Sequence, residues 1–226
     1  MSVRLIAMTQ PVYGAFTDPT HGGKITLSPE DLVAYCARVS NPANQGNFDT
    51  SAKLLKYLSK NQHWSPFEMV HIVMEINTTR DIARQILRHR SFSFQEFSQR
   101  YADASQLGFQ TREVRLQDTK NRQNSIETSD QKIKDAWVLK QKQLIHEAKL
   151  AYKWALENGV AKEQARAVLP EGITMSRMYM AGSLRSWIHY CQLRMENGTQ
   201  KEHREIATEC WNIITTQFSS IKTLEE

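Results

Sequence analysis

"VHIVMEINTTRDIARQILRHR", residues 70–90, changes its hydrophobic period halfway along, and this change decides the class of fold. From Val70 to Ile76 every second residue is apolar, which indicates a strand with one buried face. From Ile82 to Leu87 the apolar residues return at three- and four-residue spacing, which is typical of a helix packed on a core. A strand that runs directly into a helix predicts a protein of mixed α and β structure.

The flanking sequence contains more helix than strand. Ser28 with Pro29 predicts a helix start, and Asn158-Gly159 predicts a helix end. The predicted helices cover residues 28–39, 49–61, 78–90, 130–158, 161–170, 183–196 and 200–218, and the predicted strands cover residues 3–7, 70–76 and 174–182. Residues 103–129 are polar and irregular, and we expect a long loop there. The sequence therefore predicts one helix-rich α+β domain over residues 1–226, with a small, mostly antiparallel sheet.

Composition is that of an ordinary globular protein. Of the 226 residues, 40% are hydrophobic and 9% aromatic, and the formal net charge is +5. The mild positive charge favours anionic partners, but acidic residues are scattered among the basic ones along the whole chain. No apolar run reaches the roughly 18 residues that cross a bilayer, and the first apolar run is too short for a signal peptide. We expect a cytoplasmic protein, or one of a host cytoplasm, with no membrane partner.

Cys36, Cys191 and Cys210 are the three cysteines. Their odd number and wide spacing predict neither a disulfide framework nor a zinc site. Each falls in a predicted helix, so we expect small core residues.

Three consecutive cations, Arg88, His89 and Arg90, end the helix predicted over residues 78–90. Cations at the end of a helix complement its dipole, which is one explanation for them. Hydroxyl and amide side chains continue downstream through Ser98 and Gln99, and this donor-rich stretch suits phosphate or carbonyl oxygens. A helix end, a nucleic-acid strand and a small phosphorylated ligand all remain compatible with the pattern.

Phe92, Phe94 and Phe97 alternate with these polar residues. Aromatic side chains can stack on bases, but they more often anchor a loop to its core, and we favour anchoring. The sequence has no glycine-rich phosphate loop, no HExxH or CxxC metal pattern and no GxSxG nucleophile motif, so we expect no metal.

A second candidate is "SLRSWIHYCQLRMENGTQ", residues 183–200. Arg185 and His189 share one helical face, Ser183 lies at the helix start, and Arg194 lies at its end. Arg166, in "QARAVLP", could equally be a solvated surface charge.

Together these stretches resemble the flavin-dependent thymidylate synthases. The family's hallmark, RHR followed by seven residues and Ser, is present here from Arg88 to Ser98. "LVAYCARVSNP", "HWSPFE", "ARQILRHR", "SQRY", "ARAVLP" and "GSLRSWIHYCQLR" match in the same order, from about residue 28 to 210. The versions "FQEFSQRY" and "NGTQ" look most like those of viral and phage members.

The resemblance implies sites for two anionic ligands, FAD and dUMP. Its FAD positions are Ser65, Glu68, Arg88, His89, Arg90, Glu96, Ser183, Arg185 and His189. Its dUMP positions are Gln85, Arg88, Glu96, Ser98, Gln99, Arg100, Arg166 and Arg194, and His63 matches a histidine near the flavin and folate pocket. Three positions depart from the family pattern: Ser183 stands for a common Asn, Gln99 for a common Gly, and Asn197 precedes "GTQ" where many members have "HAQ".

The implied reaction is the reductive methylation of dUMP to dTMP. Methylenetetrahydrofolate gives the carbon, and NADPH gives the hydride through FAD. Arg194, as the catalytic residue, would stabilise negative charge that develops on the N3 and O4 side of uracil, and no cysteine nucleophile is needed. The resemblance also implies a homotetramer whose sites are shared between subunits, and no nucleic-acid partner. Two alternatives stay open on the residues alone: a nucleic-acid-binding module without enzymatic activity, and a flavoprotein that acts on another nucleotide.

Overall fold

The computed structural model describes residues 1–17 and 22–221, and a four-stranded antiparallel sheet lies at its centre. The strand order is β1 (Ser2–Met8), β4 (His71–Thr79), β8 (Met175–Ser183) and β5 (Ser93–Glu96). Helices cover more of the chain than strands do. The predicted α+β class, with a small antiparallel sheet, is confirmed.

Strands β4 and β8 form the middle of the sheet because their apolar residues alternate in the same register. They pair along nine positions, from His71 opposite Ser183 to Thr79 opposite Met175. Met74 lies opposite Met180 within this pairing, and both side chains are fully buried. The two strands thus present one apolar surface to the helices.

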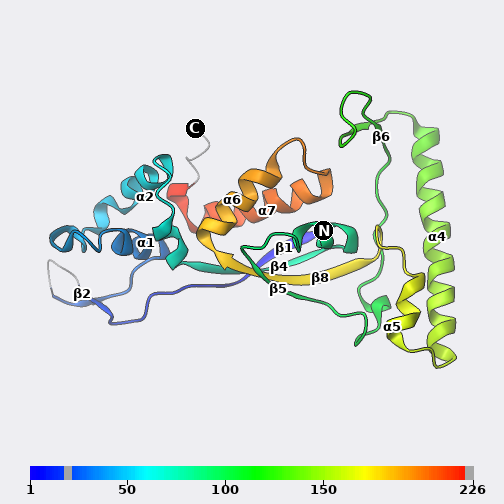
Figure 1. Cartoon of the computed structure of the whole chain (residues 1–226), viewed down its shortest axis with the longest axis horizontal. Helices are drawn as coiled ribbons and strands as arrows, with labels where there is room; N and C mark the ends of the chain where they lie inside the picture. Colours follow the sequence, from blue (N-terminus) through cyan, green and yellow to red (C-terminus); the bar gives the residue numbers. More distant parts are fainter. Residues whose placement is uncertain (18–21, 222–226) are drawn as a thin grey trace.

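Helices α6 (Leu184–Met195) and α7 (Lys201–Gln217) lie side by side along one face of this sheet (Figure 1). Trp187 and Ile214 from these helices are fully buried in the main core. Helix α3 (Arg80–Ile86) continues directly from β4 and packs against α7. At one end of the sheet stand α1 (Pro29–Ala37), which Ser28 caps as predicted, and α2 (Ser51–Lys60).

Helix α4 (Gln131–Glu157) stands at the opposite end of the molecule, with α5 (Lys162–Ala165) beside it (Figure 1). A second, smaller core joins these helices to the segment before them, through Ala104, Tyr152 and Leu169. Among residues 1–17 and 22–221, no helix is both long enough and apolar enough to cross a bilayer.

Two sequence expectations are corrected. The helix predicted over 78–90 is only Arg80–Ile86, because Thr78 and Thr79 extend β4 and the chain turns after Leu87 toward β5. The loop predicted over 103–129 contains a hairpin of β6 (Arg115–Gln117) and β7 (Ser125–Glu127). The remaining short elements are β2 (Phe16–Thr17), β3 (Lys24–Ile25) and the 3₁₀ turns Pro42–Asn44, Phe48–Thr50, Ser65–Met69, Ala104–Gln106 and Arg166–Val168.

Candidate functional site

The three consecutive cations form the turn that links α3 to β5. The backbone N–H of His89 donates to the carbonyl of Ile86 at 3.0 Å, so the turn wraps around the end of the helix. His89 is turned inward and half-buried, whereas Arg88 and Arg90 are exposed. Neither arginine side chain has an ion-pair partner within the part of the chain that the structure describes. Two unneutralised cations two residues apart in the sequence favour a bound anion nearby.

Phe92 fixes this turn to the core. Its ring contacts Trp187 edge to face, with 4.9 Å between ring centroids, and it packs so closely on Gly182 that a Cβ there would lie 2.5 Å from the ring. Phe94 also packs against the main core. The anchoring interpretation of these two residues is confirmed, and their rings are not displayed for base stacking.

His89 meets Arg194 beneath the turn. Arg194, in the last turn of α6, donates its Nε–H to Nε2 of His89 at 2.9 Å. Burial and the Arg194 charge lower the pKa of His89 to about 4. His89 is therefore neutral at pH 7, with its proton on Nδ1, and it holds the guanidinium of Arg194 in one orientation.

A buried hydrogen-bonded group lies next to this pair. His203, on α7, bridges the Tyr190 hydroxyl at 3.1 Å and the Gln85 amide at 3.2 Å. Burial lowers the pKa of His203 to about 3, and the charge of Arg194 adds to the effect. Gln85 continues through Gln200 to Glu202. We call Gln85, His89, Tyr190, Arg194 and His203 the His89–Arg194 cluster.

A second group, the Glu68–Arg185 cluster, lies where α6 begins. Arg185 forms an ion pair with Glu68, and His189 lies one turn further along α6. The His189 ring meets Trp64 edge to face at 4.6 Å between centroids, and burial together with Arg185 lowers its pKa. Ser183 caps α6 by accepting the N–H of Ser186 at 3.2 Å. The cluster comprises Glu68, Ser183, Arg185 and His189, with Ser65 exposed nearby at the start of the same 3₁₀ turn as Glu68.

A third group, the Arg100–Arg166 cluster, lies beside α5. Arg100 pairs with Glu163 at 3.3 Å, and Nε of Arg166 donates to the Glu163 carbonyl at 3.3 Å. Gln99 is buried just before Arg100, and its Nε2 has no hydrogen-bond partner among the described residues. A buried unpaired amide costs about 1–3 kcal/mol, so it is well placed to donate to a ligand.

At position 99 this chain has Gln where the family pattern commonly has Gly, and the backbone there does not require a glycine. Gln62 is the one non-glycine residue with positive φ within residues 1–17 and 22–221. Gln99 therefore adopts a conformation that any L-residue accepts, and a glycine is not needed there.

Glu96 lies at the end of β5 within a network of charges. Its Oε1 accepts from the Ser176 hydroxyl at 2.6 Å and lies 3.7 Å from Arg80. Arg80 also pairs with Glu171, as does Arg84, and the hydrogen bond from Arg84 is the main reason that the pKa of Glu171 falls to about 2.

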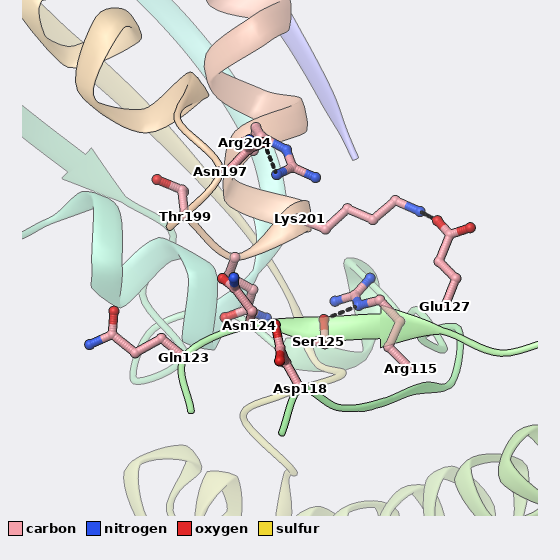
Figure 2. A pocket seen from close by; sticks show the side chains of 11 residues that line it. Arg115, Asp118, Gln123, Asn124, Ser125, Glu127, Asn197, Thr199, Lys201 and Arg204 are labelled. Carbon is pink, nitrogen blue, oxygen red and sulfur yellow. Dashed lines mark hydrogen bonds and ion pairs between the residues drawn. The ribbon is translucent and has the colours of Figure 1, made fainter. Parts of the chain in front are cut away.

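A cavity of about 340 Å³ lies between the start of α7 and the β6–β7 hairpin (Figure 2). Asn197 and Thr199 line it from the "ENGT" loop, and Arg115 lines it from the hairpin. Ion pairs of Lys201 with Glu127 and Glu113 fasten the hairpin to α7. Asn197, one of the positions that depart from the family pattern, thus lines a polar cavity.

The structure groups the predicted residues but does not bring all of them together. The Arg100–Arg166 cluster lies with α5 and α4 at one end of the molecule, while the other two clusters include residues of α6, which lies over the middle of the sheet (Figure 1). His63 is exposed, with its ring 6.2 Å from that of Tyr57. Sequence reasoning missed Tyr190, Glu202, His203 and Arg115, which look like ordinary helix and loop residues. In the described chain, no three His, Cys, Asp or Glu side chains gather as a metal site.

Comparison with known proteins gives consistent matches. The family model Thy1, thymidylate synthase complementing protein, matches residues 24–218. A flavin-dependent thymidylate synthase from Synechocystis is 48% identical over 98% of this chain and 97% of that protein. A "probable flavin-dependent thymidylate synthase" from Paramecium bursaria Chlorella virus 1 is 45% identical over 98% of this chain and 97% of that protein.

A solved structure shares the fold. The crystal structure of a UMP/dUMP methylase from Streptomyces cacaoi, bound with 5-Br dUMP, superposes with a TM-score of 0.75. The match covers 98% of this chain and 94% of that chain at 22% sequence identity. At this identity the likeness concerns the arrangement of helices and strands alone.

Proposed function

This chain belongs to the flavin-dependent thymidylate synthase family, and from that premise we propose that it converts dUMP to dTMP at a site built around Arg194. Methylenetetrahydrofolate is the one-carbon donor, and FAD with NADPH is the reductant. The contact of Arg194 with His89 carries the proposal, because it fixes a guanidinium beside two exposed arginines without ion-pair partners. No cysteine nucleophile takes part.

The nucleotide site draws on Gln85, Arg88 and Arg194 and on the Arg100–Arg166 cluster. Arg88, Arg100 and Arg166 offer cations for a phosphate, and the unpaired amide of Gln99 offers a buried donor. The complete proposed set is Gln85, Arg88, Glu96, Ser98, Gln99, Arg100, Arg166 and Arg194.

The residues present also fit FAD. Arg90 is an exposed cation without an ion-pair partner in the described chain, and it suits a pyrophosphate. The Glu68–Arg185 cluster adds a carboxylate, a guanidinium and a hydroxyl, and the rings of His189 and Trp64 meet edge to face. We propose that Ser65, Glu68, Arg88, His89, Arg90, Glu96, Ser183, Arg185 and His189 hold the flavin, with His63 at the pocket edge.

When bound, FAD supplies the hydride chemistry, and the protein supplies binding, orientation and charge. Arg194 faces the N3 and O4 side of uracil, where negative charge develops during reaction at carbon 5. Because neutral His89 already accepts the Nε–H, the guanidinium needs no rearrangement when that charge appears. An oriented cation in a partly buried site can contribute about 2.7–4 kcal/mol to the transition state, as one oxyanion-hole donor does.

Arg194 lies on α6 and Arg166 lies in the 3₁₀ turn after α5, in different clusters, so we propose a homotetramer with shared sites. Helix α4 supports this proposal, because it exposes Ile133, Trp137, Leu144 and Trp154 at one end of the molecule. Exposed apolar side chains on one element are typical of an association surface. We further propose that residues 1–226 form one catalytic domain and that the enzyme works in the cytoplasm, or in a host cytoplasm.

The experiment for shared sites mixes two inactive variants. Arg194→Ala and Arg166→Ala are assayed separately for dTMP formation, and are then unfolded and refolded together. Shared sites predict that activity returns in the mixture, because some hybrid sites then contain both wild-type arginines. Sites confined to one chain predict no recovery, and Lys56→Ala on the exposed face of α2 is the matched control for loss of a cation.

A further inference from the structure

Four hydrogen bonds between side chains connect the buried Tyr190 hydroxyl to the carboxylate of Glu202. Tyr190 lies 3.1 Å from Nε2 of His203, and Nδ1 of His203 lies 3.2 Å from Oε1 of Gln85. Nε2 of Gln85 then donates to Oε1 of Gln200 at 2.9 Å, and Nε2 of Gln200 donates to Glu202 at 2.9 Å. From Gln85 to Glu202, each amide donates an N–H to the next side chain along the series.

The charge at the Glu202 end fixes that direction. Arg115 donates to both carboxylate oxygens of Glu202, at 2.7 and 2.8 Å. Burial would raise the pKa of Glu202, but hydrogen bonds from its own backbone, Arg115 and Gln200 outweigh it, and the pKa is lowered. An ionised carboxylate only accepts, so Gln200 must turn its N–H groups toward Glu202 and its carbonyl toward Gln85.

The same logic reaches Gln85 and His203. Because Gln200 presents a carbonyl, Gln85 must meet it with Nε2, which leaves Oε1 of Gln85 facing His203. His203 must then carry its proton on Nδ1 and accept the Tyr190 hydroxyl on Nε2. If every hydrogen bond in the series ran the other way, the Gln200 carbonyl would face the Glu202 carboxylate, and both groups only accept hydrogen bonds.

We propose that His203 is a positioning residue for substrate, which together with the Gln200 carbonyl holds the Gln85 amide so that an N–H, rather than a carbonyl, is offered to the nucleotide. His203 is fully buried and cannot touch the substrate itself, whereas Gln85 is half-buried with one N–H of its amide left over. The atom that Gln85 meets on the nucleotide is then an acceptor, a carbonyl, hydroxyl or phosphate oxygen. This inference rests on the proposed function, in that Gln85 contacts dUMP.

Three variants of the FAD-loaded enzyme test the proposal by calorimetric titration with dUMP. His203→Leu removes the donor to Oε1 of Gln85 and leaves the amide held by Gln200 alone, so the dUMP dissociation constant should rise about tenfold, the usual size for one oriented hydrogen bond. His203→Asn can still donate near the former Nδ1 and should restore most of the affinity. Tyr190→Phe is the matched control, because it disturbs the same buried group but leaves the donor to Gln85 in place. It should lower stability and leave dUMP affinity unchanged.

Wild-type affinity for dUMP in His203→Leu, or an equal loss in Tyr190→Phe, would overturn the proposal. Gln85→Ala distinguishes failure of the positioning role of His203 from failure of the proposed function. If the wild type binds dUMP but Gln85→Ala binds it equally well, the positioning role is wrong while the proposed function stands. Failure of the wild type to bind dUMP defeats the proposed function itself. If His203→Leu does not fold, ¹⁵N NMR of histidine-labelled wild type decides: a proton on Nδ1 of His203 supports the proposal, and a proton on Nε2 overturns it.

Discussion

Arg194 donates its Nε–H to Nε2 of His89 at 2.9 Å, across 105 residues of sequence. This bond joins the last turn of α6 to the turn after α3, the two stretches that carry the most distinctive residues of the chain. Burial, with the charge of Arg194, keeps His89 neutral, and the bond holds Arg194 in one orientation.

Stability should fall as pH is lowered from about 7 to about 5. Burial lowers the pKa of His203 from 6.5 to about 3, and that of His89 from 6.5 to about 4. Below pH 6.5 the unfolded chain therefore binds more protons than the folded one, so stability is complete above that pH and is lost below it. Urea unfolding at the two pH values measures this loss. His203→Asn should reduce the loss, and His146→Asn on the exposed face of α4 should not. An unchanged pH dependence in His203→Asn would show that His203 does not titrate as described.

FAD binding should depend on Arg90. This exposed guanidinium has no ion-pair partner among the described residues, and the proposal pairs it with an anionic group of the flavin nucleotide. Losing one partner of a buried, hydrogen-bonded charge pair commonly costs about 2–5 kcal/mol. Arg90 is exposed in the free chain, so the loss should be smaller, and Arg90→Ala should weaken FAD binding by about tenfold. Titration of the apoprotein, followed by visible absorbance, measures the change against Lys56→Ala. A wild-type protein that takes up no FAD would contradict the flavin site altogether.

Gly182 should tolerate no side chain. A Cβ there would lie 2.5 Å from Cδ1 of Phe92, whose ring is held by Trp187 and Tyr190. Gly182→Ala should therefore lower the free energy of unfolding by about 1–3 kcal/mol. Gly172→Ala is the matched control, since no atom lies within 4 Å of its Cβ, and it should change stability by less than about 0.5 kcal/mol. Equal stability of the two variants in urea would show that Phe92 moves aside freely.

The cysteines should be dispensable for turnover. Cys191 and Cys210 are buried, and Cys36 is half-buried. Burial raises the thiol pKa of Cys36 and of Cys210, which disfavours the nucleophilic thiolate. Alanine at each position should cost some packing and leave dTMP formation measurable. A folded Cys191→Ala enzyme that binds FAD and dUMP but makes no dTMP would contradict this prediction.

The sequence was most informative where a hydrophobic pattern repeats over many residues. Strand β4 could be predicted because apolar residues alternate along it, whereas the helix after it was predicted but its ends were not. The β6–β7 hairpin could not, since Leu116 and Ile126 are the central apolar pair of two three-residue strands. A three-residue strand is too short for the alternation of apolar and polar residues to be recognised.

The candidate site divides in a similar way. The RHR turn is visible in sequence because three cations are adjacent, but His203 looks like any residue in the first turn of an amphipathic helix. Its partner Gln85 lies 118 residues away, and the partner of Glu202, Arg115, lies 87 residues away. Only the folded chain brings such pairs together.

The rate of dTMP formation at saturating dUMP, in wild type and in Arg194→Ala, tests the central claim most directly. The reaction contains methylenetetrahydrofolate, FAD and NADPH, and FAD binding is measured on the same samples. The account predicts that the wild type makes dTMP and that Arg194→Ala is slower by about 10²–10³, with FAD affinity little changed. Lysine at this position should rescue poorly, because it lacks the planar guanidinium that donates to His89. No dTMP from the FAD-loaded wild type, or near-normal turnover in Arg194→Ala, would contradict the account.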